Sequence, residues 1–216
     1  MEETTSNPFK KAGLVLLIIG VIDIGVMVYC ITNGMSYSSS FNIFAVIAGA
    51  LLLRGGVKTA RVIRWFSIFM AFSFIGVFLI TPLTTPLGLI ATKLKINTFN
   101  TVATVAFGAF FIALLFWLYQ QLSSTAALKK IGDAGYKTGK PKTAVIASFV
   151  LVAILGVTFF TMLNGESAEK AKLLAQNKLG QEYSYHISSI SISGESGHAL
   201  VIAYTDSEIK GVQVQW

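Results

Sequence analysis

The positive charges of this chain fall in three clusters, and each cluster borders a long apolar segment. The clusters are Lys10 and Lys11; Arg54, Lys58, Arg61 and Arg64; and Lys129, Lys130, Lys137, Lys140 and Lys142. Together they hold 11 of the 17 Lys and Arg residues. Cations beside membrane spans set topology, because cytoplasmic loops carry an excess of Lys and Arg. The pattern therefore predicts an integral membrane protein and also its orientation.

The composition supports lipid as the solvent for most of the chain. Hydrophobic residues make up 54 % of the sequence and charged residues only 12 %, whereas soluble domains carry about 25 % charged residues. The net charge of +7 resides mainly beside apolar segments, so we expect it to set topology and expect no nucleic-acid partner. The single cysteine, Cys30, excludes an intrachain disulfide.

Five segments are apolar enough to span a bilayer: residues 12–33, 37–57, 62–81, 101–121 and 143–163. A helix of about 20 residues crosses a hydrocarbon core of about 30 Å. The second segment is the weakest, because its uninterrupted apolar core covers only residues 41–53. A re-entrant half-helix is the alternative for that segment.

The charge distribution favours five full crossings. Five crossings place all three cationic clusters on one side and leave only Lys93 and Lys95 in the loops of the other side. A re-entrant second segment would move the four-cation cluster across the membrane and remove this bias. We expect a plasma-membrane protein, in a bacterial inner membrane, with a cytoplasmic N-terminus and a periplasmic or extracellular C-terminus.

Two connections between the spans carry helical patterns. In the outer loop 82–100, an apolar stripe of Leu87, Ile90, Ala91 and Leu94 predicts a short helix lying in the membrane interface. An ordinary solvated connection is the alternative. On the inner side, the fourth helix is expected to continue through residues 128–131.

The composition turns polar at Asn164, so the sequence divides into a transmembrane domain, 1–163, and an extracytoplasmic α+β module, 164–216. The pattern predicts one helix over 166–179 and then a three-strand antiparallel meander. A bulge or break is expected at Ser188-Ser189, and a loop over 193–197. Such a small unit buries little surface alone, so we expect it to pack on the membrane domain, on a second copy or on a protein partner.

Asp23 lies in the middle of the first apolar segment. An acid at a helix centre costs about 2.5–3.5 kcal/mol on insertion scales, so its carboxyl must face protein or water. One interpretation is a protonatable or ion-binding group in a transfer path. The other is a hydrogen-bonded acid that joins helices, with Ser67, Ser73 and Thr158 as candidate partners.

Four cations at the start of the third segment, Arg54, Lys58, Arg61 and Arg64, are candidate contacts for lipid headgroups. Guanidinium groups match phosphate oxygens in pairs, so a phosphate-bearing headgroup or a nucleotide would fit. Topology anchors whose side chains extend to the interface are the alternative.

The sequence contains no recognisable catalytic, cofactor or metal motif. His186 and His198 are the only histidines, and the predicted hairpin places them more than about 20 Å apart at roughly 3.3 Å per residue, too far to share a metal ion. The first hypothesis is therefore a non-enzymatic membrane accessory, assembly or scaffold protein that presents 164–216 to a partner or to a second copy. The alternative is a small transporter or proton-coupled component that uses Asp23.

Overall fold

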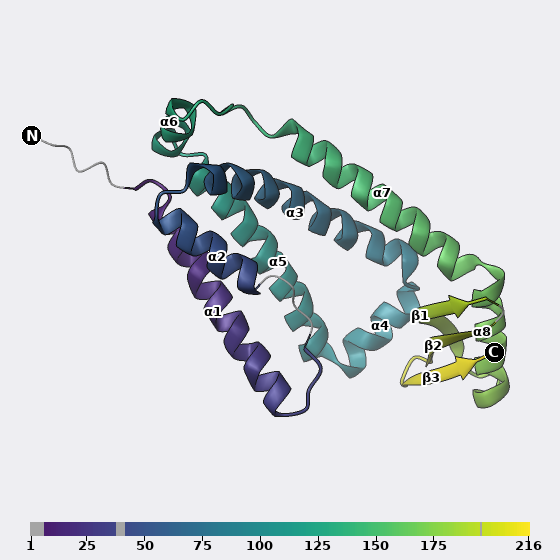
Figure 1. Ribbon diagram of the computed structural model, residues 1–216. Helices are drawn as coiled ribbons and strands as arrows, with labels where there is room; N and C mark the ends of the chain where they lie inside the picture. The colour runs from purple at the N-terminus through teal and green to yellow at the C-terminus, as the bar shows by residue number, and fades with distance from the viewer. Residues whose placement is uncertain (1–6, 38–41, 195) are drawn as a thin grey trace, which may run out of the picture. The chain divides into compact units, whose positions relative to one another are not determined.

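The computed structural model describes residues 7–37, 42–194 and 196–216 (Figure 1). Within these residues, four helices are long and apolar enough to cross a membrane. They are α1 (Lys10–Thr32), α3 (Val57–Thr84), α5 (Thr98–Leu122) and α7 (Lys142–Asn164). By length and composition the chain is thus a multi-pass membrane protein.

The chain forms two compact units, and each is described by itself. The N-terminal unit contains residues 1–71 and 113–146, and the C-terminal unit contains residues 72–112 and 147–216. Helices α3, α5 and α7 contribute one part of their length to each unit.

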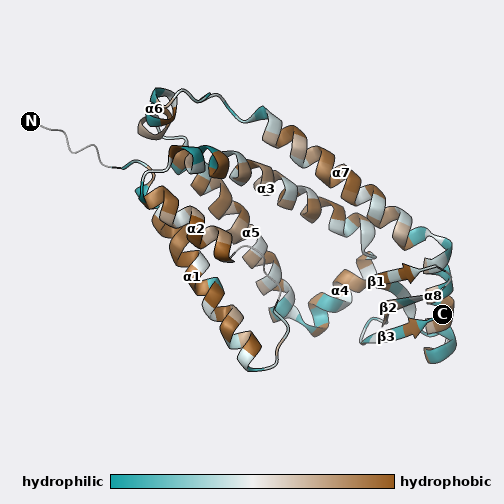
Figure 2. Ribbon diagram, in the orientation of Figure 1, coloured by the Kyte–Doolittle hydropathy of each residue, from teal (hydrophilic) through white to brown (hydrophobic). Residues whose placement is uncertain are grey.

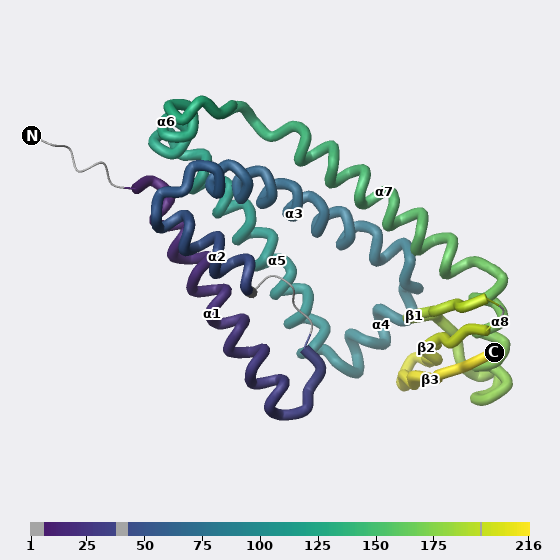
Figure 3. Tube along the Cα trace, viewed as in Figure 1, coloured from purple at the N-terminus to yellow at the C-terminus, as the bar shows by residue number. Residues whose placement is uncertain are grey.

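In the N-terminal unit, α1 packs closely against α2 (Asn42–Leu53), and the two run in opposite directions (Figure 3). Two glycines allow this approach. A Cβ atom on Gly49 would lie 2.7 Å from the carbonyl oxygen of Gly13 and 2.7 Å from the backbone nitrogen of Leu17. Small residues let helices in lipid approach until their backbones touch, where van der Waals packing holds them together.

The second predicted span differs from the prediction in length. Helix α2 has 12 residues, which rise about 18 Å at about 1.5 Å per residue, less than a bilayer core. It ends before Gly55, whose φ of +80° breaks the helix. The chain nevertheless returns to the start of α1, because the Asn7 side-chain amide donates to the carbonyl oxygens of Leu52 at 2.8 Å and Leu53 at 2.9 Å. Residues 38–41, where this predicted span begins, lie outside the described residues.

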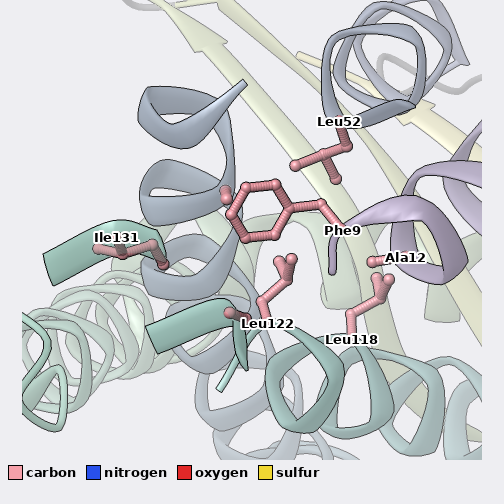
Figure 4. Close-up of a cluster of buried hydrophobic side chains, with 8 residues drawn as sticks. Phe9, Ala12, Leu52, Leu118, Leu122 and Ile131 are labelled. Carbon is pink, nitrogen blue, oxygen red and sulfur yellow. The ribbon is translucent and has the colours of Figure 1, made fainter. Parts of the chain in front are cut away.

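One cluster of buried apolar side chains holds the N-terminal unit together at this point (Figure 4). The ring of Phe9 lies in its middle, with Leu52 from α2 and Leu122 from α5 beside it. Ile131 comes from α6 (Thr125–Asp133), an amphipathic helix that buries Ala127 and Ile131 in the same cluster.

The prediction that the fourth helix continues through residues 128–131 is wrong. Helix α5 ends at Leu122, and Ser124 caps a separate helix by accepting a hydrogen bond from the backbone nitrogen of Ala127 at 3.4 Å. A serine at this position satisfies one of the free N–H groups at a helix start, which favours a break over a continuous helix.

In the C-terminal unit, glycines again allow close contact between apolar helices. A Cβ atom on Gly76 of α3 would lie 2.5 Å from a methyl group of Val152 on α7. Gly108 of α5 faces the Phe78 ring of α3 in the same way.

The prediction of one helix and a three-strand antiparallel meander after α7 is confirmed. Helix α8 (Glu166–Leu179) ends at Gly180, whose φ is +92°. It is followed by β1 (Ser184–Ser193), β2 (Ser196–Tyr204) and β3 (Ile209–Gln215) in the order β1-β2-β3. The register shifts between Ile187 and Ser189, where the sequence predicted a bulge.

The predicted loop over 193–197 is shorter in the structure, because Ser193 pairs with Ser196 and β2 begins there. Gly197 extends the ladder by exchanging two backbone hydrogen bonds with Trp216, at 2.8 and 2.9 Å. The end of β3 thus holds the start of β2 in the sheet, a contact that local sequence cannot indicate.

The long helices are hydrophobic along most of their length (Figure 2), and many of their large apolar side chains are exposed. Ile22, Phe107, Phe149 and Phe160 are all exposed. A helix that is apolar around its whole circumference and exposed in a single chain is typical of a membrane span.

We predict that Gly49→Ala separates α1 from α2 and lowers the stability of the N-terminal unit by about 1–3 kcal/mol, the usual cost of overpacking. The reason is that the new methyl group meets backbone atoms that cannot rotate away. Thermal unfolding of the purified protein in detergent measures the change. Gly25→Ala is the matched control, because nothing lies within 4 Å of a Cβ atom at Gly25. Equal midpoints for the two variants would contradict the prediction.

Candidate functional site

Helix α8 covers one face of the sheet in the C-terminal unit. Three alanines of α8, Ala168, Ala171 and Ala175, are fully buried against the sheet. The facing side chains are Ile187, Ala199, Val201 and Val214. Small side chains on the helix bring its backbone close to the strands, so a short helix and three strands form a compact apolar core.

Helix α4 (Leu87–Ile96) covers part of the other face. The Thr92 hydroxyl, with 2 % of the residue exposed, donates to the carbonyl oxygen of Thr205 at 2.8 Å. A Cβ atom on Gly88 would lie 3.3 Å from the Tyr204 ring, so glycine lets the two elements touch. The short helix predicted in the outer loop is thus present and contacts the sheet.

The two sides of α4 have different surroundings. Leu89 and Thr92 are buried, whereas Leu87 is 75 % exposed and Leu94 is also exposed. Leu87 and Leu94 belong to the apolar stripe that the sequence predicts for the membrane interface. Both leucines thus point away from the sheet. An exposed apolar stripe with Lys93 and Lys95 next to it has the composition of an interfacial helix.

His186 pairs with Ile202 of β2. Side chains alternate between the two faces of a strand, and the neighbouring Ile187 packs against α8. His186 therefore lies on the opposite face, which α4 partly covers. Partial burial, and to a lesser extent the positive charges of Lys93 on α4 and Lys172 on α8, lower the pKa of His186 below its ordinary value. Burial and like charges both disfavour the imidazolium, so the folded module prefers a neutral His186.

The far end of the sheet carries a shallow pocket of about 240 Å³. Its lining residues are Ser191, Ser193, Ser196, Gly197, His198, Gln215 and Trp216. The Lys170 ammonium group of α8 lies 5.9 Å from the Trp216 ring centroid. The side chains of these lining residues offer hydroxyl, amide and imidazole groups for hydrogen bonding.

The two histidines are closer than the sequence predicted, because the hairpin turn is shorter. His198 pairs with Ser191 and His186 with Ile202, four ladder steps apart, or about 13 Å at roughly 3.3 Å per residue. That separation is still too large for one metal ion. Among the residues that the structure describes, no three His, Cys, Asp or Glu side chains gather where they could hold a metal ion.

Asp23 is half-buried on α1 and accepts a hydrogen bond from the Tyr37 hydroxyl at 2.7 Å. The same hydroxyl lies 3.3 Å from the backbone carbonyl oxygen of Asp23. Sequence reasoning named Ser67, Ser73 and Thr158 as candidate partners and missed Tyr37, which lies 14 residues downstream in the connection after α1. A hydrogen bond of this kind satisfies the carboxyl and fixes the start of the returning chain.

Cations from all three clusters come together in the N-terminal unit. The first and second meet where Asn7 bonds Leu52 and Leu53, and the third joins them through α6, whose Lys130 ammonium lies 5.3 Å from the Phe9 ring centroid. Segments that are far apart in sequence therefore place their positive charges around the apolar cluster of Phe9.

The four candidate headgroup contacts differ in exposure. Arg54, Lys58 and Arg61 are exposed, whereas Arg64 has only 6 % of its surface exposed. The Arg64 Nε atom donates to the Ser123 hydroxyl at 2.8 Å. Arg64 is thus the one member of the set that the fold buries.

We predict that the module loses stability as the pH falls from about 8 to about 5. The pKa of an unfolded histidine is about 6.5, and that of the folded His186 is lower. The unfolded chain therefore binds the extra proton first, and stability declines below about 6.5. Hydrogen exchange of the β2 and β3 amides between about pH 8 and about pH 5 measures this loss of stability. His186→Gln should flatten the pH dependence and His198→Gln should preserve it. An unchanged dependence in His186→Gln would refute the assignment.

The chain matches no protein-family model, no curated protein and no solved structure.

Proposed function

We propose that this protein is a non-enzymatic accessory or assembly protein of a plasma membrane, of the bacterial inner-membrane type. In this proposal the chain crosses the bilayer five times, with its N-terminus in the cytoplasm. The module 164–216 then lies on the outer side, where it is presented to a protein partner or to a second copy.

Convergence of the cationic clusters supports the five crossings. The end of α2 bonds to the start of α1 through Asn7, so the returning segment brings Arg54 and its neighbours back to the side of Lys10 and Lys11. A re-entrant second segment would return the chain to the side opposite Lys10 and Lys11. Arg54 and its neighbours would then lie across the bilayer from them. The gathered cations mark the cytoplasmic side by the positive-inside rule.

The geometry of α4 supports a module held at the membrane surface. One side of α4 contacts Tyr204 and Thr205 of the sheet, and the opposite side exposes Leu87 and Leu94. In a bilayer interface those leucines would face acyl chains. The chain's own helices would then fix the orientation of the sheet.

The β1 edge of the sheet is the observation that carries this proposal. β1 is the ten-residue outer strand and contains no charged residue and no proline. Native edge strands are usually protected by Lys, Pro, a bulge or a covering element, because an open edge pairs with other chains. The bulge of β1 lies between Ile187 and Ser189, and the regular segment, residues 189–193, follows it. Exposed Ser188, Ser189 and Ser191 leave this edge accessible for strand addition.

Asp23 enters this proposal as a residue that positions the returning chain. Its hydrogen bond from Tyr37 explains an acid in an apolar helix by a contact that needs no transported proton.

Topology can be tested with reporter fusions. A reporter that is active only outside the cytoplasm should be active behind Trp216 and inactive behind Gly139, since an odd number of crossings separates the N-terminus from the module. A reporter active only in the cytoplasm should give the opposite pattern. Cytoplasmic activity behind Trp216 would contradict five crossings.

Ser191→Lys should weaken partner capture, because a charge beside the open β1 edge disfavours strand addition. The measurement is chemical crosslinking in native membranes, followed by identification of the crosslinked neighbour. Asn177→Lys adds the same charge at an exposed position of α8 and should leave the crosslink intact. A product of twice the chain mass would identify self-association. Equal crosslinking in both variants would rule out the β1 edge.

A further inference from the structure

Two arginines near the start of α3 each lie on a tyrosine ring. The Arg61 guanidinium carbon is 5.2 Å from the ring centroid of Tyr136, and that of Arg64 is 5.6 Å from the ring centroid of Tyr119. The two tyrosines come from different segments, the connection after α6 and helix α5. Cation–π contacts of this kind hold a guanidinium in place while leaving its N–H donors for other partners.

Arg64 is held more firmly than Arg61. The residue is 6 % exposed, and its Nε atom is fixed by the Ser123 hydroxyl at 2.8 Å. Arginine has five N–H donors in a planar fork, so the terminal nitrogens keep donors after this bond. Positions three apart on a helix lie on one side, about 5–6 Å from each other, so Arg61 and Arg64 can reach one ligand.

The described residues provide no carboxylate partner for either arginine. Their only ion pair joins Lys210 to Glu208 in the C-terminal unit. A charge that is removed from water without a counter-ion is costly, because the lost hydration is not replaced. Arg64 is therefore a largely buried cation whose charge no described carboxylate neutralises.

The start of α3 is strongly positive. Its first turn contains no acidic residue, and its first two turns carry Lys58, Arg61 and Arg64. Clustered charge of one sign raises the local concentration of the opposite ion, so this end of the helix attracts anions.

We propose that Arg61 and Arg64 bind one phosphate-bearing anion, with Tyr136, Tyr119 and Ser123 as positioning residues. Two guanidinium forks match the oxygens of a phosphate and supply the charge that it needs. The phosphate is that of an anionic phospholipid headgroup or a free inorganic phosphate. This inference is independent of the β1 edge, since both arginines and their contacts belong to the N-terminal unit.

The test uses the full chain, purified in a neutral detergent at constant ionic strength, and follows its thermal unfolding. The probes are phosphatidylglycerol, a diacylglycerol with the same acyl chains but no phosphate, and inorganic phosphate. A ligand that binds the folded state raises the unfolding midpoint by mass action. A rise with phosphatidylglycerol alone identifies the lipid as the source, and a rise with inorganic phosphate identifies the free anion.

Arg61→Gln and Arg64→Lys should each weaken the apparent affinity for the active probe by about tenfold or more, because a charge-assisted fork is lost. Arg61 is exposed, so its variant tests binding without disturbing a buried contact, and Arg64→Lys keeps the charge. Lys129→Gln, an exposed cation of α6, is the control and should bind as the original chain does. The proposal is overturned by equal midpoint shifts in all variants, by an equal shift with diacylglycerol, or by no shift with either phosphate probe.

Discussion

The burial of Phe9 among side chains from three other helices is the contact on which the N-terminal unit depends. Residues that are far apart in sequence, Leu52, Leu122 and Ile131, meet its ring. Leu52 is followed closely by Arg54, and Ile131 is preceded directly by Lys129 and Lys130. The apolar contact therefore brings cations from three separate clusters to one place, although their charges repel one another. Burial of a phenylalanine contributes about 1.5–3 kcal/mol relative to exposure, and its neighbours contribute more.

Aromatic rings stabilise part of this gathered charge. Lys130 lies over Phe9, Arg61 over Tyr136 and Arg64 over Tyr119. Such contacts are worth about 0.5–2 kcal/mol each, depending on how far the cation is removed from water. They orient the side chains, but they do not neutralise them. Aromatic rings thus hold Arg61, Arg64 and Lys130 in fixed places without removing their charge.

The apolar helices rely on shape more than on hydrophobicity for their contacts. Lipid tails solvate leucine as well as a neighbouring helix does, so helices in a membrane associate where small residues permit dense packing. Gly13 and Gly49 provide this between α1 and α2, and Gly76 provides it between α3 and α7. The same device recurs at Gly88, where α4 meets the sheet. Glycine placement thus decides which elements touch.

The sequence alone determined the apolar segments, the cationic clusters beside them, the terminal helix and the three strands. These features follow from composition and from periods of 2 and 3.6 residues, which are local properties. The bulge after Ile187 was visible for the same reason, because the apolar positions change parity there. Asp23 also stood out locally, as an acid within an apolar run.

Only the tertiary structure decided which residues meet. The hydrogen bonds from Tyr37 to Asp23, from Arg64 to Ser123 and from Thr92 to Thr205 join positions 14, 59 and 113 residues apart. No local period encodes such contacts, because they depend on how helices and strands pack after they have formed. The sequence therefore supplied the elements and the charges, and packing decided that Arg64, among four similar cations, is the buried one.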